Sequence, residues 1–412
     1  MTAPRARGFA FEVKAKAATG HARAAVLTTP HADVETPTFM PVGTQGSVKG
    51  LTAEDVASTG AKVMLGNTYH LWLRPGPDVI AKLGGLHGFT RWPHAMLTDS
   101  GGFQAFSLGG NSGSRAPGAT KTQGAPRTRG NETTQAPPKS LVKLDEEGFT
   151  FRSHLDGAKH HLSPEVAVRV QGKIGADIQM QLDVCSPGDS SRAVVEAAVA
   201  RTTRWARRAL ATERPEGQAL FGIVQGACFA DLRRAHADEL AGLDIGGATF
   251  DGLALGGFSV GEPIPRMYET LHEMAHMVDP ERPRYLMGVG TPKDLLEAID
   301  AGIDMFDCVL PTRNARNGQA LTRFGKVVVK QAKWREDPSP IDPDCTCACC
   351  AGGYSRGYLR HLFLAGEMSV LRLLSIHNLH WYGELVRGAR DAIKKGTWPA
   401  YKTATLARME SS

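Results

Sequence analysis

The chain has 412 residues, of which 42% are hydrophobic and 22% are charged, and its formal net charge is +6. These values are typical of a globular protein with a large core, and they argue against a disordered or fibrous chain. No apolar run reaches the length of a membrane span, and the basic N-terminus lacks the apolar centre of a signal peptide, so we expect a cytoplasmic protein with no membrane partner.

Eight short apolar segments alternate with helix-forming segments between residues 38 and 311. The alternation indicates a parallel sheet covered on both faces, and eight repeats predict an α/β fold of the (β/α)8 TIM barrel type, with a doubly wound sheet as the alternative. Helices are expected at 191–211 and at 291–302, where Thr291 and Pro292 supply the N-cap and first turn. The expected strands are TFMPV (38–42), KVMLGN (62–67), AMLTD (95–99), DIQMQLD (177–183), LFGIVQ (220–225), GLALGG (252–257), RYLMGV (284–289) and MFDCVL (305–310).

Two segments interrupt this alternation. Residues 109–140 are rich in Gly, Pro, Ser and Thr and have almost no apolar content, so we predict a disordered or loose insert. Residues 149–163 alternate around Asp156-Gly157, which predicts a β-hairpin. A β-like stretch, a cysteine cluster and further helices follow residue 311.

Polar side chains lie at the ends of several predicted strands. Asp99, Asp183 and Gln225 end their strands, and Asp307 lies within the last one. Active sites of barrel enzymes form at the carboxyl ends of the strands, so these residues are candidates for catalysis. Each Asp could instead cap a helix or hold a loop. Asp307 could also be half of a structural ion pair, since Arg313 and Arg316 follow closely.

The motif DSGGFQ places two glycines and an aromatic ring directly after Asp99. Gly101 and Gly102 allow the backbone to approach a ligand, and Phe103 offers a flat face for stacking. A tight turn without a ligand is the simpler alternative.

Three thiols of the cysteine cluster have the spacing of a metal site. Cys345, Cys347 and Cys350 would supply three ligands, and the fourth would come from further along, the candidates being His361, His377 and His380. Three Cys and one His form a closed tetrahedral set for zinc, so we predict a structural rather than a catalytic Zn2+ site. Cys349 is the spare thiol.

The stretch from Arg313 to Arg335 is basic and contains no acidic residue. It connects the strand of Asp307 with the cysteine cluster. A solvated basic face and a nucleic-acid contact are equally favoured, because phosphates need clustered Lys and Arg.

Several motifs, taken in order, resemble one family, the tRNA-guanine transglycosylases (queuine tRNA-ribosyltransferases), and its bacterial type in particular. The resemblance runs from about residue 9 to about residue 405, apart from the insert. It implies a TIM barrel core at 9–311 and, at 312–405, the basic segment, a zinc-binding subdomain inserted near the C-terminus and helices that close the barrel. The motifs are DSGGFQ (99–104), FGIVQG (221–226), LGGFSVGE (255–262), MGVGTP (287–292), FDCVLPTRNARNG (306–318) and the cysteines with LSIHN (374–378).

The resemblance also implies a role for each candidate. Asp307 matches the nucleophile that attacks the ribose and expels guanine, and Asp99 matches the general base. The other implied positions fall into three groups. The base-binding group is Asp99, Ser100, Gly101, Gly102, Phe103, Asp183, Gln225, Gly256, Gly257 and Met287. The RNA-binding group is Gly288, Val289, Gly290, Thr291, Pro292, Lys293, Asp294, Thr312, Arg313, Asn314, Ala315 and Arg316. The zinc ligands are Cys345, Cys347, Cys350 and His377.

The implied reaction replaces guanine at the wobble position of tRNAs with GUN anticodons by a double displacement through a covalent Asp307–ribose intermediate, a step of queuosine biosynthesis. Cys185 and Val260 resemble the bacterial pocket, which favours 7-aminomethyl-7-deazaguanine as the incoming base. The family further implies a homodimer that binds the tRNA anticodon loop. A non-catalytic RNA-binding subunit and a zinc hydrolase are the competing functions; the presence of both Asp99 and Asp307 argues against the first, and a four-ligand zinc site argues against the second.

The insert departs from the family pattern and follows directly on the motif of Asp99. It carries five basic residues and one glutamate, so one hypothesis is a disordered basic loop that contacts tRNA. A tolerated surface insertion is the favoured alternative.

Overall fold

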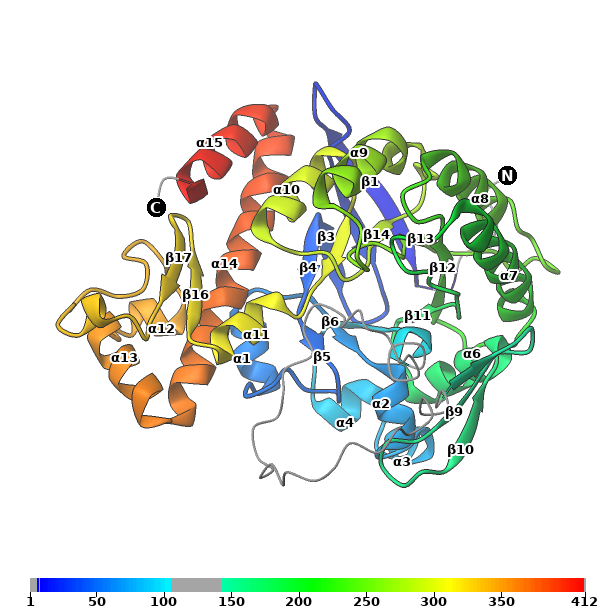
Figure 1. Ribbon diagram of the computed structural model, residues 1–412, viewed down its shortest axis with the longest axis horizontal. Helices are drawn as coiled ribbons and strands as arrows, with labels where there is room; N and C mark the ends of the chain where they lie inside the picture. Colours follow the sequence, from blue (N-terminus) through cyan, green and yellow to red (C-terminus); the bar gives the residue numbers. More distant parts are fainter. Residues whose placement is uncertain (1–5, 7, 105–141, 411–412) are drawn as a thin grey trace, which may run out of the picture.

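A computed structural model of the chain describes residues 6, 8–104 and 142–410 (Figure 1). The insert predicted at 109–140 lies outside the described residues. No helix in the described ranges is both long and apolar enough to cross a membrane.

The centre of the molecule is a parallel barrel. Hydrogen bonds join its strands in the order β4-β15-β14-β13-β12-β11-β7-β6-β5. The two outermost members flank Pro41, which has no N–H to give to a ladder, so they are two halves of one strand and the eight-stranded ring closes on itself. The predicted TIM barrel is therefore confirmed over the open sheet. The strands are β4 (Thr38–Met40), β5 (Val42–Gly43), β6 (Val63–Gly66), β7 (Ala95–Thr98), β11 (Ile178–Met180), β12 (Ala219–Val224), β13 (Gly252–Leu255), β14 (Arg284–Leu286) and β15 (Met305–Asp307).

Alternate strand residues fill the barrel interior and cover its outside. Met180, Phe221 and Met305 belong to the inner cluster, while Leu220 and Phe306 belong to the larger cluster between strands and helices. All five side chains are fully buried. This two-sided burial explains the continuous apolar runs of the sequence.

Helices surround the barrel in Figure 1. The helices expected at 191–211 and 291–302 are α7 and α10, and Thr291 forms a capping box with Asp294 at the start of α10. The helices are α1 (Ala53–Ser58), α2 (Thr68–Leu73), α3 (Pro77–Lys82), α4 (Gly85–Thr90), α6 (Pro164–Ile174), α7 (Arg192–Leu210), α8 (Ala230–Ala241), α9 (Ile264–Met274), α10 (Pro292–Asp300), α11 (Leu310–Arg316), α12 (Ala348–Ala351), α13 (Arg356–Ala365), α14 (Met368–Lys394) and α15 (Trp398–Glu410). Two 3-10 turns, η1 (Ala275–Met277) and η2 (Ala332–Trp334), complete them.

Three antiparallel sheets accompany the barrel. The predicted hairpin is present as the antiparallel pair β9 and β10, with Thr150 opposite His161. The sheet β1-β2-β3 near the N-terminus was not predicted. The strands are β1 (Ala10–Lys16), β2 (Arg23–Thr28), β3 (Asp33–Thr36), β8 (Val142–Leu144), β9 (Phe149–Arg152), β10 (Lys159–Leu162), β16 (Gln319–Thr322) and β17 (Gly325–Val328).

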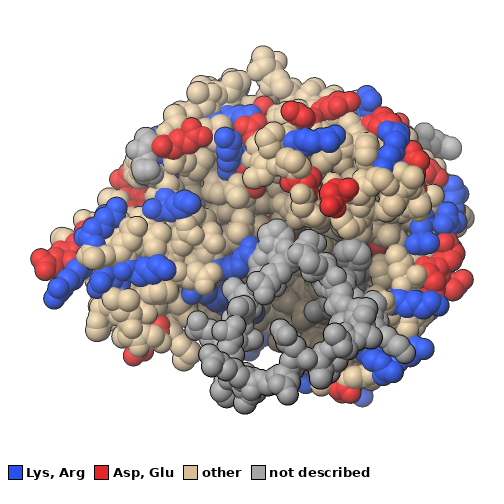
Figure 2. All heavy atoms as spheres, viewed as in Figure 1, with Lys and Arg blue, Asp and Glu red and all other residues tan. Residues whose placement is uncertain are grey.

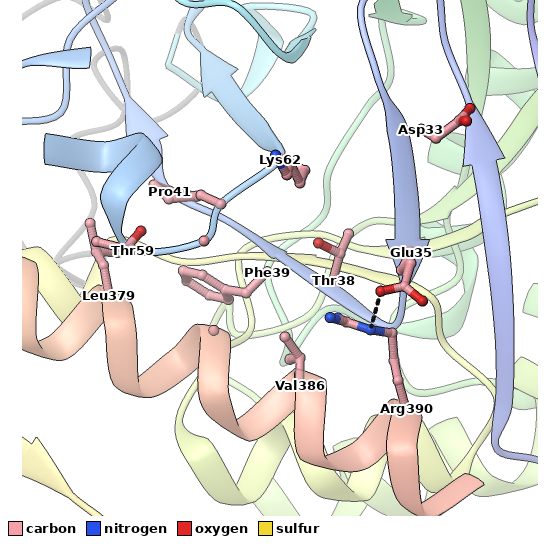
Figure 3. A pocket seen from close by; sticks show the side chains of 13 residues that line it. Asp33, Glu35, Thr38, Phe39, Pro41, Thr59, Lys62, Leu379, Val386 and Arg390 are labelled. Atoms are coloured by element: carbon pink, nitrogen blue, oxygen red, sulfur yellow. Dashed lines mark ion pairs between the residues drawn. The ribbon is translucent and has the colours of Figure 1, made fainter. Parts of the chain in front are cut away.

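The long helix α14 runs from the cysteine cluster along the side of the barrel (Figure 1). Near its C-terminal end, Arg390 donates a 2.8 Å hydrogen bond to the carbonyl of Pro37 and lies 3.7 Å from Glu35. A cavity of about 180 Å³ lies between this helix and the barrel (Figure 3), lined by Thr38 and Lys62, which precede or begin their strands. This cavity is therefore at the amino ends of the strands.

Candidate active site and metal centre

The predicted polar residues follow the carboxyl ends of neighbouring parallel strands. Asp99 directly follows β7, and Gln225 directly follows β12. Asp307 is the last residue of β15 rather than an interior one. Asp183 lies three residues past β11, because that strand is shorter than its apolar sequence predicts. These side chains therefore gather at one mouth of the barrel, opposite the cavity beside α14.

Asp307 is held by two donors on one of its oxygens. The Tyr285 hydroxyl donates a 2.6 Å hydrogen bond to Oδ1, and the Gly288 N–H donates one of 2.8 Å. Within the described residues, no donor binds Oδ2. Burial raises the pKa of Asp307, and the hydrogen bond from Tyr285 opposes that rise. The structure thus does not support the alternative in which Asp307 is paired with a following arginine.

Asp99 accepts hydrogen bonds from the start of α2. The Thr68 N–H lies 2.8 Å from Oδ1, and the Asn67 side-chain nitrogen lies 2.5 Å from Oδ2. Burial raises the pKa of Asp99 to about 7, and the nearby carboxylates of Asp307 and Asp183 add to the rise. A carboxyl with this pKa exchanges protons readily at neutral pH, which suits a general base or acid.

Asp183 and Gln225 form one polar unit. The Gln225 side-chain nitrogen donates a 2.6 Å hydrogen bond to Asp183 Oδ2. Burial raises the pKa of Asp183 to about 6. The Gln225 amide packs against two glycines, since a Cβ at Gly256 would lie 2.7 Å and one at Gly257 2.3 Å from its atoms. A side chain at either position would displace this amide, and Gly257 also has a φ of +68°, which favours glycine.

The other predicted base-binding positions lie near these groups in the chain. Ser100 is buried and accepts a 3.3 Å hydrogen bond from the Gly102 N–H, while the Gly101 N–H donates to Asp99. Phe103 leaves 45% of its surface exposed, so its ring face can receive a planar ligand. Met287 follows β14 and packs against the inner barrel cluster.

The predicted RNA-binding segments are partly buried. Gly288, Thr291 and Lys293 are exposed, and Arg313, Asn314 and Arg316 are half-buried. The buried members support the loop instead: Asp294 caps α10 and accepts from the Tyr268 hydroxyl at 2.5 Å, and the Gly290 carbonyl accepts from Tyr382 of α14 at 2.7 Å. The remaining buried side chains are Val289, Thr312 and Ala315, and Pro292 is half-buried.

Cys345, Cys347, Cys350 and His377 form the metal centre, and their ligand atoms all lie within 4.8 Å of one another. The three sulfurs lie 3.6, 3.5 and 3.3 Å from His377 Nδ1. A tetrahedral zinc ion with ordinary bond lengths separates N and S by about 3.6 Å, so the residues fit the ion. His377 Nε2 lies 2.9 Å from the Leu321 carbonyl, which leaves Nδ1 for the metal. Cys349 is buried but is not a member of this set, and the predicted structural zinc site is confirmed.

Basic side chains extend from the barrel mouth over the C-terminal part of the molecule. Figure 2 shows Lys and Arg on the left lobe, where β16, β17 and α13 lie in Figure 1. Lys326, Lys330, Lys333 and Arg335 are exposed there. This surface could attract an anionic partner.

Sequence reasoning missed three residues that support the site. Asn67 and Tyr285 bind the two candidate catalytic carboxylates, and Arg233 of α8 is fully buried behind the ends of β12 and β13. A tyrosine at an inward position of a barrel strand and an arginine on the apolar face of a helix are the signals that could have indicated two of them.

The chain was compared with known proteins. A family model described as queuine tRNA-ribosyltransferase matches residues 17–411. The chain is 61% identical to a queuine tRNA-ribosyltransferase of Sorangium cellulosum over 98% of this chain and 92% of that protein. It is 49% identical to the protein of the same description from Solidesulfovibrio magneticus, over 93% and 94% of the two chains. The corresponding Fusobacterium nucleatum protein is 45% identical, over 95% and 96%.

Proposed function

Because the chain belongs to the queuine tRNA-ribosyltransferase family, whose members exchange guanine at position 34 of tRNA in queuosine biosynthesis, we propose how its own residues carry out that exchange. Asp307 is the nucleophile. The observation that carries this assignment is the arrangement of its hydrogen bonds, both on Oδ1, which leaves Oδ2 for a bond to carbon. Asp307 sits at the barrel mouth, where the wobble nucleotide of an unpaired anticodon loop can enter without breaking a duplex.

The first displacement transfers the ribose to the enzyme. Asp307 Oδ2 attacks C1′, the bond from C1′ to N9 breaks, and the electron pair leaves with guanine. Asp99 in its protonated form gives the departing base a proton, which its pKa of about 7 permits at neutral pH. The product is a covalent ester between Asp307 and the ribose of tRNA, analogous to the intermediate of retaining glycosidases.

The second displacement reverses these steps with a different base. Asp99, now ionised, takes the proton from N9 of the incoming base, N9 attacks C1′, and the bond to Asp307 breaks. Two inversions restore the original configuration at C1′. The chain thus needs one group that changes protonation between the half-reactions, and we assign this role to Asp99, whose pKa of about 7 lies near neutral pH.

Recognition of the base falls to the remaining mouth residues. Asp183 can accept two hydrogen bonds from guanine, one from N1–H and one from the 2-amino group. Gln225 is bound to Asp183 and packs on Gly257, so we assign these two residues to the neighbouring part of the same edge of the base. Phe103 and Met287 cover the two ring faces. We propose 7-aminomethyl-7-deazaguanine as the incoming base, on the grounds of Cys185 and Val260 in the pocket sequence.

We propose further that tRNAs with GUN anticodons are the substrates and that segments 288–294 and 312–316 contact the anticodon loop. Their exposed members include Lys293, which can contact a phosphate. In this division the barrel core at 9–311 holds the chemistry and the first RNA-contacting segment, and residues 312–405 hold the second segment and the zinc. A tRNA substrate and a thiolate-bound zinc both fit a reducing cytoplasm.

A homodimer is proposed from the exposed apolar side chains of the C-terminal lobe. Met368 is 81% exposed, Leu364 58% and Tyr358 47%. Tyr354 and Tyr358 present stacked rings on and beside α13, with centroids 6.1 Å apart. Such a surface beside the zinc site is suited to burial against a second copy of the chain.

Exchange of labelled guanine tests the proposed mechanism. Wild-type protein should incorporate label into unmodified tRNA with a GUN anticodon, and Asp307→Asn should not. Denaturing electrophoresis should also show a protein–tRNA adduct for the wild type only. Undiminished incorporation by Asp307→Asn would reject the nucleophile, and absence of incorporation by the wild type would reject the reaction.

A further inference from the structure

Arg233 lies behind the base-binding mouth and binds only backbone carbonyls among its described hydrogen-bond partners. It is 0% exposed. Its Nε donates to Ala227 at 2.5 Å and its Nη1 to Val224 at 3.2 Å. Its Nη2 donates to the Gly256 carbonyl at 2.9 Å and to the Gly257 carbonyl at 3.4 Å. One guanidinium thus joins the end of β12 to the end of β13.

The neighbouring backbone is built around this guanidinium. Its carbon lies 3.7 Å from the centre of the Phe258 ring. Ala227 has a φ of +47°, which a non-glycine residue rarely adopts, and its carbonyl is one of the four acceptors. A Cβ at Gly226 would lie 2.6 Å from Arg233 Cγ. A buried guanidinium is costly in free energy unless its N–H groups are hydrogen-bonded. The carbonyl acceptors, the Phe258 ring and the glycine at 226 therefore together accommodate the Arg233 side chain.

The carbonyl bonds fix the direction of two peptide units. In a trans peptide the C=O and the following N–H point to opposite sides. Since the Gly256 and Gly257 carbonyls point toward Arg233, the N–H groups of Gly257 and Phe258 point away from it. The Gly257 N–H adjoins the Gln225 amide, which packs on Gly256 and Gly257 and is bound to Asp183, and the Phe258 N–H follows it in the chain.

We propose that Arg233 is a specificity-determining positioning residue, which aims these N–H donors at the base so that the site accepts a 6-oxo purine and rejects a 6-amino one. This inference rests on the proposed function, because it concerns the same base site. A donor pair matches the O6 acceptor of guanine, whereas the amino group of 2,6-diaminopurine would leave both donors unpaired. A buried polar group left unpaired is what makes such discrimination strong.

The test compares Arg233→Lys and Arg233→Met with matched variants of the next residue, Arg234→Lys and Arg234→Met. Arg234 lies on the same helix, but its side chain is 39% exposed and pairs with Glu273 at 3.6 Å. Exchange is measured as a function of guanine concentration and of tRNA concentration, which gives a KM for each. Exchange is then measured in the presence of 2,6-diaminopurine as a competing base, which gives the preference for guanine. The amount of protein–tRNA adduct gives the concentration of folded, active enzyme, so a partly unfolded variant is still scored.

For both Arg233 variants we expect the KM for guanine to rise by about tenfold or more, the KM for tRNA to stay within about twofold, and the preference for guanine over 2,6-diaminopurine to fall by about tenfold. The Arg234 variants should behave like the wild type. A lower adduct yield with an unchanged KM for guanine and unchanged preference would overturn the inference and leave Arg233 a purely structural residue. Absence of guanine exchange by the wild type would instead reject the proposed function, and with it the inference.

Discussion

The hydroxyl of Tyr285 and the carboxylate of Asp307 are joined by a 2.6 Å hydrogen bond across neighbouring strands of the barrel. The bond stabilises the ionised carboxylate, because a charged oxygen is a stronger hydrogen-bond acceptor than the carbonyl oxygen of a neutral carboxyl. Tyr285 is buried and Asp307 is half-buried, so few other donors can replace this one.

We therefore expect Tyr285→Phe to raise the pKa of Asp307 and to slow exchange by about 10- to 100-fold, the usual effect of a hydrogen bond to a charged group. The limb of the pH profile on which Asp307 becomes ionised should move to higher pH. The measurement is adduct formation in a single turnover as a function of pH. The same pH profile in Tyr285→Phe and wild type would show that Tyr285 only fills space.

Asp99 should give exchange a dependence on pH near neutrality. Its folded-state pKa is about 7, so the base form is the minor one below that pH, and the capture of an incoming base should slow by about tenfold for each pH unit further down. Asp99→Asn should remove this limb and most of the activity. Measuring the second half-reaction alone, with preformed adduct and added base, separates Asp99 from Asp307. If the rate of the second half-reaction in the wild type does not change between pH 5 and pH 8, Asp99 is not the general base.

Replacing Asp183 should stabilise the fold while reducing base binding. Its folded pKa of about 6 lies above the unfolded value, so the folded state favours the protonated form, and its stability falls as pH rises through that interval. Asp183→Asn should then raise the free energy of unfolding by about 1 to 3 kcal/mol at pH 8 and by less at pH 5. Denaturant unfolding at the two pH values checks this. Equal or lower stability of the variant at pH 8 would contradict the argument.

The zinc site should contain one ion per chain. Cys350→Ala or His377→Ala should abolish it and lower the unfolding temperature, whereas Cys349→Ala should keep it, because Cys349 lies outside the ligand set. The measurement is metal content by mass spectrometry together with thermal unfolding. Loss of zinc in Cys349→Ala with retention in Cys350→Ala would reassign the ligand.

The proposed dimer predicts that charges on the C-terminal lobe separate the subunits. The double change Tyr358→Asp and Met368→Lys should shift the sedimentation coefficient to that of a monomer. Ile264→Lys is the control, since Ile264 is 59% exposed but lies on α9, away from that lobe. A wild-type chain that sediments as a monomer at micromolar concentration would reject the dimer.

The sequence predicted the barrel because each strand is apolar on both faces, and it predicted the mouth because parallel strands end at one edge. The strand of Asp183 ends earlier than predicted: Gln181 and Leu182 are fully buried, but the regular parallel ladder of β11 ends at Met180, and beyond it the Gln181 N–H still donates to the next strand. The residues that donate hydrogen bonds to the Asp99 and Asp307 carboxylates could not be predicted from the sequence. Asn67 reaches Asp99 from 32 residues away, and Tyr285 reaches Asp307 from 22, so both contacts depend on the pairing of adjacent strands, β6 with β7 and β14 with β15.

The sheet β1-β2-β3 was missed for a related reason. Its outer strands β1 and β3 carry exposed residues at alternate positions, while β2 between them is mostly buried, and the three pair with one another outside the regular alternation of strands and helices that indicated the barrel. The zinc ligands were easier, since three of them lie within six residues. The fourth could be chosen only through the family resemblance, because His377 stands 27 residues beyond Cys350.

Helix α14 contacts three separate parts of the molecule: the metal centre, the loop after β14 and the amino end of the barrel. Its His377 belongs to the metal centre, its Tyr382 holds the Gly290 carbonyl in the loop after β14, and its Arg390 holds Pro37 beneath the barrel. His377 and Tyr382 are separated by about 7.5 Å of helix. The metal centre and the loop after β14 are therefore connected through one helix. A chain cut after the barrel would lose the support of this loop, whose Gly288 N–H binds Asp307, so we expect a protein shortened to the barrel alone to be inactive.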